Sequence, residues 1–362
     1  MAVLYRRQWA AAGLALWAVL SGLTGCGRPW SSVRGTPDEA GKVEVLSGQQ
    51  GHRRSRPLSG APELWVRLDP AAWELPEGLA VSGDQIVIGL APTSEVLIVD
   101  EKAQRRVFGQ LPKVAPGAGF MTGLAFDSGG GLYVGLVSFA EEGPTTGIYR
   151  IEPHGGLGTL FAAHPALTFP NGLVVRGESL YVTDSALGAV FRIDLRSAVT
   201  RIWVKSKLLR GDGQACPPAE LPFDLGANGI ALGPEGSVYV VNSDLATLVK
   251  VPRLAGGAAG RPEVVVGPAC AQLEGADGLL VTPTGDWLVT ANRLNKLLRV
   301  SASGQITVLH SGAPLDFPSN IAVRDDGTLV IANFALMSAQ NVALRAFPGV
   351  VALPCEGCSV PK

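Results

Sequence analysis

The sequence is poor in charge, in histidine and in methionine. Only 17% of its 362 residues are charged, the net charge is −1, and it contains four histidines and three methionines. So small a net charge gives no strong field to attract nucleic acid. No segment of helical length has a 3.6-residue hydrophobic period, which argues against a mainly helical protein. By contrast, 46 glycines and 26 prolines favour short strands joined by tight turns.

The first 26 residues have the pattern of an export signal. Arg6 and Arg7 precede an apolar run from Trp9 to Leu20, and small residues lead to Cys26. The ending Leu-Thr-Gly-Cys resembles the lipobox of bacterial lipoproteins, in which cleavage leaves a lipid-modified cysteine. We therefore predict a lipoprotein of the bacterial cell envelope, attached to the membrane through Cys26 only. An uncleaved anchor or an ordinary secretory signal is the alternative.

Residues 27–60 have the composition of a flexible linker, because they are rich in Gly, Ser, Arg and Pro and show no period. The signal and the linker carry net charges of +2 and +3, so the remaining 302 residues carry −6. An acidic folded part argues further against nucleic acid as a partner. We expect a monomer with one domain over residues 61–362.

That domain contains six copies of one short pattern, in which a polar residue enters an apolar strand and is usually followed by glycine. The polar residues are aligned at spacings of 45, 49, 57, 49 and 43 residues, and they are Glu77, Thr122, Asn171, Asn228, Asp277 and Asn320. Each period has room for four short strands with turn signals between them. The sequence therefore predicts an all-β fold, a six-bladed β-propeller of four-stranded antiparallel blades. The strand at Leu64–Leu68 is expected to complete the last blade and close the ring.

In a propeller the first strand of each blade lies nearest the axis, so the six aligned residues should surround one mouth of the channel. Acids and carboxamides that converge there need a cation or water to satisfy them. Calcium suits an all-oxygen set, whereas zinc and copper would prefer His or Cys. The alternative is that Asn-Gly and Asp-Gly only form turns.

The repeat resembles that of the senescence marker protein/gluconolactonase family, also called regucalcin-like, and of its relatives the squid-type diisopropylfluorophosphatases and paraoxonases. The family's first-blade Glu, third-blade Asn and fifth-blade Asp match Glu77, Asn171 and Asp277 in the motifs Pro-Glu-Gly, Phe-Pro-Asn-Gly and Ala-Asp-Gly. The fourth-blade Asn of the phosphatase and paraoxonase branches matches Asn228. The resemblance covers about Leu64 to Pro348, and it implies a six-bladed propeller with calcium at the channel mouth.

The resemblance also implies calcium-dependent hydrolysis of a small lactone, ester or phosphoester. Glu77, Asn171, Asn228 and Asp277 would be the metal ligands, and Asp277 would also act as general base or nucleophile. Thr122 and Asn320 would contact substrate or the ligands. His164, on a loop before Asn171, is the histidine that could carry a proton, although an ordinary loop residue is the alternative.

A non-catalytic function is the rival hypothesis. Propellers of the NHL type share this spacing and the strand ends Tyr-Val-x-Asp/Asn, found here at 181–184 and 239–242. Many serve as binding platforms, so a tethered propeller could present one face to an envelope polymer or a protein. Fold alone does not decide between the two functions.

Four cysteines remain after Cys26, and an even number in an exported chain predicts disulfides. Cys216 and Cys270 lie on adjacent loops before Asn228 and Asp277, so we expect them to pair. Cys355 and Cys358 are expected to pair locally near the C-terminus. A redox CxxC site is the alternative for the second pair.

Overall fold

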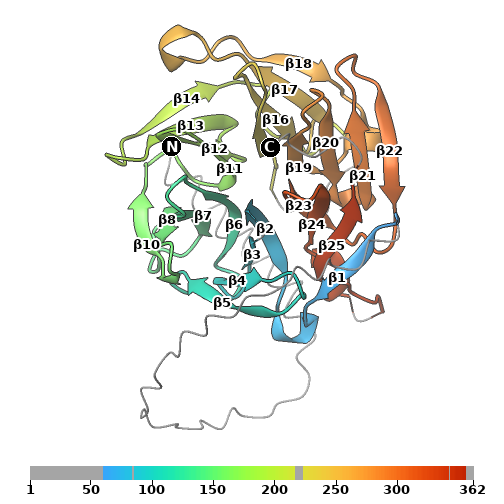
Figure 1. Ribbon diagram of the computed structural model, residues 1–362. Helices are drawn as coiled ribbons and strands as arrows, with labels where there is room; N and C mark the ends of the chain where they lie inside the picture. Colours follow the sequence, from blue (N-terminus) through green and yellow to red (C-terminus); the bar gives the residue numbers. More distant parts are fainter. Residues whose placement is uncertain (1–59, 84, 217–222, 342, 356–362) are drawn as a thin grey trace.

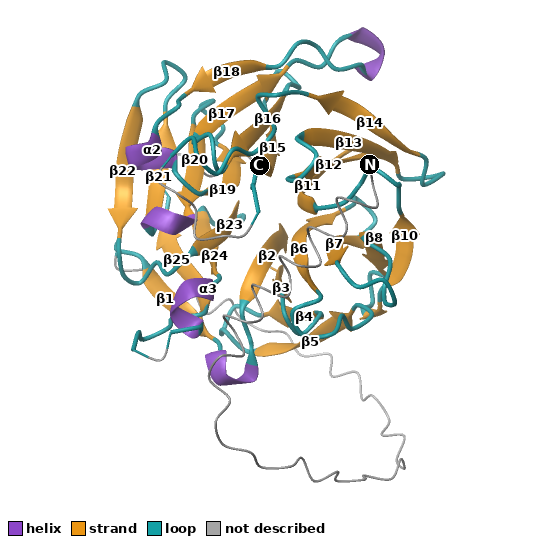
Figure 2. Ribbon diagram, turned by 180° about the vertical axis from the view of Figure 1, so that it is seen from behind, coloured by secondary structure: helices purple, strands orange, loops and turns teal. Residues whose placement is uncertain are grey.

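The computed structural model describes residues 60–83, 85–216, 223–341 and 343–355. These residues form six antiparallel sheets arranged radially around one axis (Figures 1 and 2). This confirms the predicted six-bladed β-propeller. The predicted signal, the lipidation site Cys26 and residues 27–59 of the predicted linker lie outside the described residues. Among the residues that are described, no helix is long and apolar enough to cross a membrane.

Blades one to three follow the chain in order from the axis outward. Their strands are, for blade one, β2 (Pro76–Ser82), β3 (Gln85–Leu90), β4 (Glu95–Val99) and β5 (Arg105–Gln110); for blade two, β6 (Gly119–Phe126), β7 (Leu132–Ser138), β8 (Gly147–Ile151) and β10 (Thr159–Ala162); and for blade three, β11 (Pro170–Arg176), β12 (Ser179–Asp184), β13 (Ala189–Asp194) and β14 (Thr200–Lys205). The two-residue strand β9 (Gly156–Leu157) adds to the outer edge of blade one in parallel with β5.

Blades four and five repeat this order, and blade six closes the ring. Their strands are, for blade four, β15 (Ala227–Leu232), β16 (Val238–Asn242), β17 (Thr247–Val251) and β18 (Glu263–Val266); for blade five, β19 (Ala276–Val281), β20 (Trp287–Ala291), β21 (Lys296–Val300) and β22 (Ile306–Ser311); and for blade six, β23 (Pro318–Val323), β24 (Thr328–Asn333), β25 (Gly349–Pro354) and β1 (Glu63–Arg67). The N-terminal strand β1 pairs with β25, as the sequence predicted, so the chain closes its own ring.

The strands differ in burial according to their distance from the axis. All six residues of β12 and all five of β16 are buried, because blades pack on both faces of these second strands. In contrast, the outer strand β14 has no buried residue and exposes Arg201, Ile202 and Lys205. The core is divided among the six seams between neighbouring blades, each filled by its own apolar cluster. The complete burial of β12 and β16 is therefore the result of packing on both faces.

Short helices occur only in connections within the described part of the chain. They are η1 (Pro70–Ala72), η2 (Ala255–Gly257), α2 (Cys270–Leu273), η3 (Asn292–Leu294) and α3 (Leu336–Ala339). Cys216 and Cys270 form a disulfide with their Cα atoms 5.5 Å apart, which confirms the predicted pair. The disulfide joins the loop before β15 to α2 just before β19. Cys355 is also disulfide-bonded, and its predicted partner Cys358 lies outside the described residues.

Candidate functional site

Each first strand has the same irregularity at one end of the propeller. The first strand there has an extra residue relative to the second strand. In blade three, for example, Pro170 pairs with Asp184 and Leu173 pairs with Val182, so three steps along β11 lie opposite two steps along β12. This is a β-bulge, and it recurs at the same place in all six blades. The residues directly after the first bulged position form a ring around the axis: Glu77, Thr122, Asn171, Asn228, Asp277 and Ser319.

The sixth member of this ring corrects the alignment made from the sequence. Pro318 and Ile321 bound the bulge of blade six, so Ser319 and not Asn320 is equivalent to Glu77. The Ser319 hydroxyl donates a 2.7 Å hydrogen bond to the carbonyl oxygen of Glu77, which joins blade six to blade one. Asn320 occupies the next position, is half-buried, and accepts a hydrogen bond from the backbone N–H of Ile321. An ungapped alignment of Pro318–Val323 with Pro76–Val81 gives the same equivalence, so the error came from taking the polar residue directly before the apolar strand as the ring residue.

Glycine follows the ring residue in the first five blades because the next blade comes very close. A Cβ atom added to Gly123 would lie 2.5 Å from the carbonyl oxygen of Asn171, and one on Gly172 would lie 2.6 Å from that of Asn228. The same approach occurs at the other three glycines, which are Gly78, Gly229 and Gly278. The glycine in the repeated Asn-Gly and Asp-Gly pairs is therefore explained by the close packing of neighbouring blades. The turn explanation is incorrect for these positions, since they lie inside strands.

The two asparagines of the ring are oriented by serines on the adjacent second strand. Asn171 donates through Nδ2 to the Ser185 hydroxyl at 3.1 Å, and Asn228 donates to the Ser243 hydroxyl at 3.0 Å. Each serine in turn donates to a carbonyl oxygen of the following blade at 2.7 Å. Because both Nδ2 groups are engaged, Oδ1 is the atom of each amide that is left to bind a cation.

Asp277 and Glu77 are the two carboxylates of the ring, and both are more than nine-tenths buried. Asn292, which follows the second strand of blade five, donates through Nδ2 to Asp277 Oδ2 at 2.7 Å. Two buried acceptor atoms, Glu77 Oε2 and Asn292 Oδ1, have no hydrogen-bond partner. Since buried polar atoms are nearly always paired, each of these two unsatisfied oxygens is available to a cation or a donor.

Burial also changes the protonation of the two acids. Loss of solvent raises the pKa of Asp277 from its ordinary 3.8 to about 7, although hydrogen bonds from Asn292 and Asn228 and the charge of Arg293 oppose the rise. Burial, and then the negative charge of Asp277, raise the pKa of Glu77 well above its ordinary value. The negative charge of one acid therefore disfavours ionisation of the other, and the two compete for ionisation. A bound cation would relieve this competition by neutralising both.

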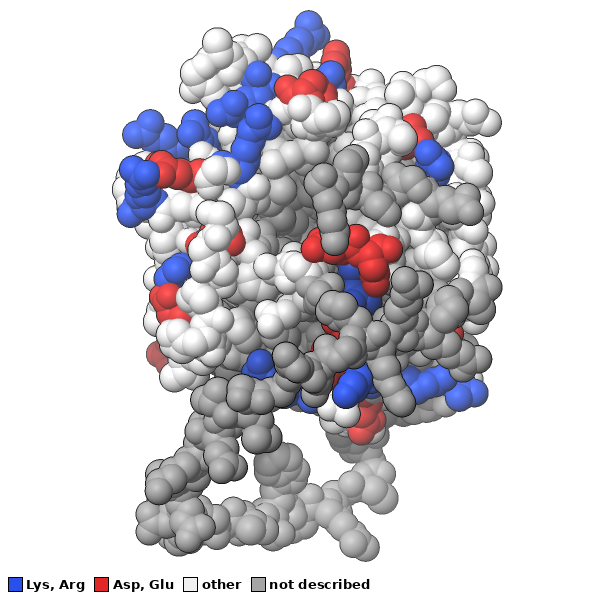
Figure 3. Space-filling view, in the orientation of Figure 1, with Lys and Arg blue, Asp and Glu red and all other residues white. Residues whose placement is uncertain are grey.

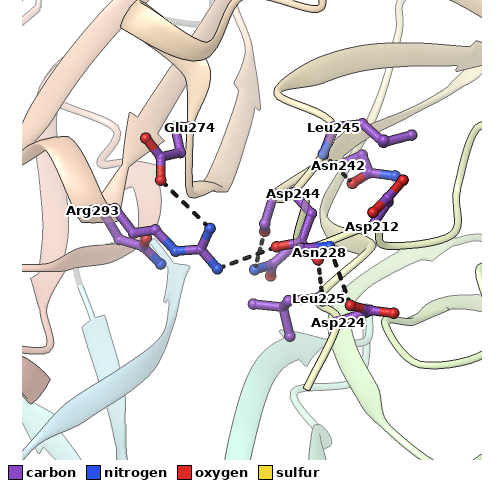
Figure 4. Close-up of polar contacts among 12 residues, drawn as sticks. Asp212, Asp224, Leu225, Asn228, Asn242, Asp244, Leu245, Glu274 and Arg293 are labelled. Atoms are coloured by element: carbon purple, nitrogen blue, oxygen red, sulfur yellow. Dashed lines mark hydrogen bonds and ion pairs between the residues drawn. The ribbon is translucent and has the colours of Figure 1, made fainter. Parts of the chain in front are cut away.

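Arg293 adds a positive charge beside the ring. Its guanidinium lies between two acids, with Nη2 3.2 Å from Asp244 Oδ1 and Nη1 3.8 Å from Glu274 Oε1 (Figure 4). Asp244 is buried on blade four and also accepts from the backbone N–H of Leu225 at 2.6 Å. In Figure 4 Asn228 lies beside this ion-paired group. Arg293 thus sets the local charge near Asp277, and it immediately follows Asn292 in the chain.

Thr122 and His164 are placed differently from the carboxylates. Thr122 is fully buried, and its hydroxyl donates to the Pro170 carbonyl at 2.9 Å, which joins blade two to blade three. His164 is half-buried, accepts from the Ala166 N–H at Nδ1, and has its ring centroid 5.5 Å from that of Phe191. Phe191 belongs to β13, the third strand from the axis, so His164 lies outside the ring of first strands.

The polar residues that end the second strands of blades three, four and six organise loops. Asn333 donates to the carbonyl oxygens of Pro314 and Phe347 at 2.9 and 2.6 Å and accepts from the Asp316 N–H at 2.8 Å. Asn242 makes equivalent bonds in blade four, and Asp184 accepts from four backbone N–H groups in blade three. The Tyr-Val-x-Asp/Asn ends are therefore structural.

Sequence reasoning missed Arg293, Asp244, Ser185 and Ser243 as neighbours of the ring. All four lie one or two residues after the end of a second strand. Antiparallel pairing returns the second strand to the face where the first one starts, so the residues just beyond each strand end could have been searched as well.

The donor set fits a hard cation. In the described part of the chain no group of three or more His, Cys, Asp and Glu side chains is arranged to hold a metal ion. The ring instead combines two carboxylates with two carboxamide oxygens, and one carboxylate oxygen has no partner. Oxygen donors of this kind match calcium, which accepts carboxylate, carbonyl and water oxygens with variable geometry.

Comparisons with known proteins agree with the fold. No protein-family model and no curated protein matches the sequence. Among solved structures, the chain is similar to one assigned as a gluconolactonase, with 13% identity, a TM-score of 0.59, and coverage of 84% of this chain and 96% of that one. It is also similar to regucalcin, a calcium-binding protein from Agrobacterium tumefaciens, with 14% identity, a TM-score of 0.54, and coverage of 82% and 97%.

A streptogramin B lyase is a third similar structure, with 15% identity, a TM-score of 0.51, and coverage of 75% of this chain and 80% of that one. The three proteins differ in what their names say they do. At these identities the similarity extends to the propeller fold, so the function must be argued from the ring residues.

Proposed function

We propose that this protein is a calcium-dependent hydrolase of lactone or ester substrates, with phosphoesters as the other chemically suitable class. The observation that carries the proposal is the pair of buried carboxylates, Glu77 and Asp277, with an unpartnered oxygen on Glu77. Such a pair is costly in the folded protein unless a cation binds to it. The similarity to a gluconolactonase and to regucalcin supports the same proposal.

The proposed ligands are Glu77, Asn171, Asn228 and Asp277, which supply two charges and at least four oxygens. These are fewer than the six to eight oxygens that calcium accepts, so positions remain for water and substrate. Asn292 is a further candidate, because its buried Oδ1 has no partner and its Nδ2 holds Asp277.

Calcium, when bound there, would polarise a carbonyl or phosphoryl oxygen of the substrate as a Lewis acid. Asp277 would also act as the general base on the attacking water, since its carboxylate belongs to the proposed ligand set and would lie next to a water bound at the same site. Asn292 and Asn228 fix the orientation of that carboxylate through their hydrogen bonds. Arg293 keeps a positive charge nearby, which favours the ionised form of Asp277.

We further propose that the protein is exported to the bacterial cell envelope and held there by a lipid on Cys26. The proposal rests on the basic start, the apolar run and the Leu-Thr-Gly-Cys ending of the N-terminal sequence. Two disulfide-bonded sites, at Cys216–Cys270 and at Cys355, are consistent with an oxidising compartment.

The test measures bound calcium by elemental analysis and chelator-sensitive hydrolysis of a lactone, an aryl ester and a phosphotriester. The full chain is compared with Asp277→Asn, Glu77→Gln and the matched control Asp286→Asn. Asp286 pairs with Arg299 at 2.5 Å and lies outside the ring.

We expect about one calcium in the parent and the control, and a loss of at least about tenfold in affinity for each ring variant. Hydrolysis should fall with calcium binding. If the parent binds calcium but hydrolyses nothing, the protein is a calcium-stabilised binding platform. If it binds no calcium, the proposal is wrong.

A further inference from the structure

Basic side chains gather on the outer surface of blades three and four, on the side of the propeller away from the ring mouth. Figure 3 shows Lys and Arg concentrated over β13, β14 and the connection that contains η2. Two chain segments contribute to this surface, 192–201 and 250–263, and together they contain six basic residues and two acids, Asp194 and Glu263. The domain as a whole carries −6, so a local charge of +4 is not an average property of the surface.

The centre of this surface is a group of three arginines that we name the arginine patch: Arg192, Arg201 and Arg253. Arg192 and Arg201 are directly opposite each other on β13 and β14, an arrangement of like charges that normally destabilises a sheet. Arg253 reaches the same seam from blade four. A Cβ atom on Gly257 would lie 3.1 Å from Arg192 Nη1 and 3.1 Å from Arg253 Nη2, so these nitrogens are at most about 6 Å apart.

Hydroxyl groups hold two of the three arginines in place, and in the described part of the chain the one acid that their charge affects is Asp194, beside Arg192. Arg192 donates through Nε to the Ser179 hydroxyl at 3.0 Å, and Arg253 donates through Nε to the Tyr181 hydroxyl at 3.3 Å. Within the described residues none of the three arginines forms an ion pair, whereas Arg196, close by, pairs with Glu178. The terminal Nη groups are thus left for an external anion, and a guanidinium binds phosphate oxygens well.

Exposed aliphatic side chains border the arginine patch. Leu254 is 51% exposed beside Arg253, and Val199 is 46% exposed just before β14. The indole N–H of Trp203 donates to the Gly257 carbonyl at 2.8 Å, which ties β14 to η2 and places both borders on one surface. A free anion would gain nothing from these aliphatic groups, but a lipid bilayer surface would accept them together with the arginines.

We propose that the arginine patch and its aliphatic border form a docking surface for a bilayer that contains anionic phospholipid. The arginines bind headgroup phosphates, while Leu254 and Val199 enter the boundary between headgroups and acyl chains. Bound in this way, the propeller directs the mouth with Glu77 and Asp277 away from the membrane. Substrate would then reach the mouth from the aqueous side. The docking surface is independent of the proposed hydrolysis.

The test is flotation of the full chain with vesicles of phosphatidylcholine alone or with about one-third phosphatidylglycerol. Every variant retains the N-terminal segment, so its contribution cancels in the comparison. Arg192→Gln/Arg253→Gln is compared with Arg67→Gln/Arg106→Gln, an exposed pair on other blades that removes the same charge and has no ion pair in the described structure. Thermal unfolding checks that both variants fold.

At about 1 kcal/mol per arginine, the patch variant should partition to anionic vesicles roughly thirtyfold less, and the control pair should change little. Leu254→Ser should weaken vesicle binding severalfold without changing retention on heparin, a soluble polyanion. Equal loss in patch and control variants would overturn the proposal, because it would show only a net-charge effect. Loss of heparin binding with no change in vesicle binding would also overturn it, in favour of a soluble anion.

Discussion

The Asn292 amide donates a 2.7 Å hydrogen bond to Asp277 Oδ2 while its own Oδ1 is buried without a partner. Asp277 lies in β19 and Asn292 directly follows β20, and antiparallel pairing of these two strands brings both residues to the same mouth. The pair links a buried acid of the ring to the polar residue that directly follows the second strand of the same blade. Four expectations follow from this arrangement and its surroundings.

Stability should depend on pH through Asp277. Its pKa is raised from 3.8 to about 7, so between these pH values the folded state binds more protons than the unfolded state. The free energy of unfolding should therefore fall as pH rises through this window in the presence of chelator. Asp277→Asn should be more stable than the parent at pH 7.5 by about 2–4 kcal/mol, and by less at pH 5.

Urea unfolding at both pH values, with chelator and with calcium, measures this effect. Calcium should stabilise the parent at pH 7.5 and leave Asp277→Asn nearly unchanged. If the unfolding midpoints of the parent and of Asp277→Asn change with pH in the same way, Asp277 is not a buried ionisable group and the prediction is wrong.

Removal of the Asn292 amide should raise the pKa of Asp277 further, because its hydrogen bond favours the ionised form. In Asn292→Ala we expect the pH of half-maximal calcium affinity to move upward by about one unit. Ser185→Ala is the control, since Ser185 has the equivalent position in blade three and contacts Asn171 instead. Calcium titrations from pH 5.5 to 8.5 separate the two variants, and equal shifts would argue against a specific role for Asn292.

Gly229→Ala should be among the most destabilising single methyl additions. The new Cβ would overlap the carbonyl oxygen of Asp277 on the next blade, so blades four and five would have to separate. We expect a loss of more than about 2 kcal/mol in the free energy of unfolding together with weaker calcium binding. Gly177→Ala, in a turn with open space around it, should lose only about 1–2 kcal/mol and leave calcium binding intact.

The Cys216–Cys270 disulfide should stabilise the loops that lead into Asn228 and Asp277. It closes a loop of 54 residues, for which the chain-entropy estimate is about 4 kcal/mol. Cys216→Ser/Cys270→Ser should lower the unfolding temperature, measured without reductant so that the disulfide at Cys355 stays intact in both proteins. Retention of the parent's unfolding temperature by the double variant would show that the disulfide does not stabilise these loops.

The sequence was sufficient for the propeller because its evidence is periodic and local. Six strand-entry patterns, four strands for each period and an unpaired strand before the first copy together require closure of β1 onto β25, which the structure confirms. The Cys216–Cys270 pair was also predictable, since the repeat places both cysteines on neighbouring loops at one face.

The sequence by itself was enough to predict the architecture and the position of Glu77 and Asp277 at one mouth of the channel. The alignment of the repeats shows which residues occupy equivalent positions in the blades. Only the tertiary structure decided the environment of each of them. The strand register placed Ser319 in the ring instead of Asn320, and packing between blades turned Thr122 toward the Pro170 carbonyl. Contacts between blades likewise placed Arg293 and created the arginine patch. Distances between blades depend on side-chain packing far apart in the chain, and no local pattern records them.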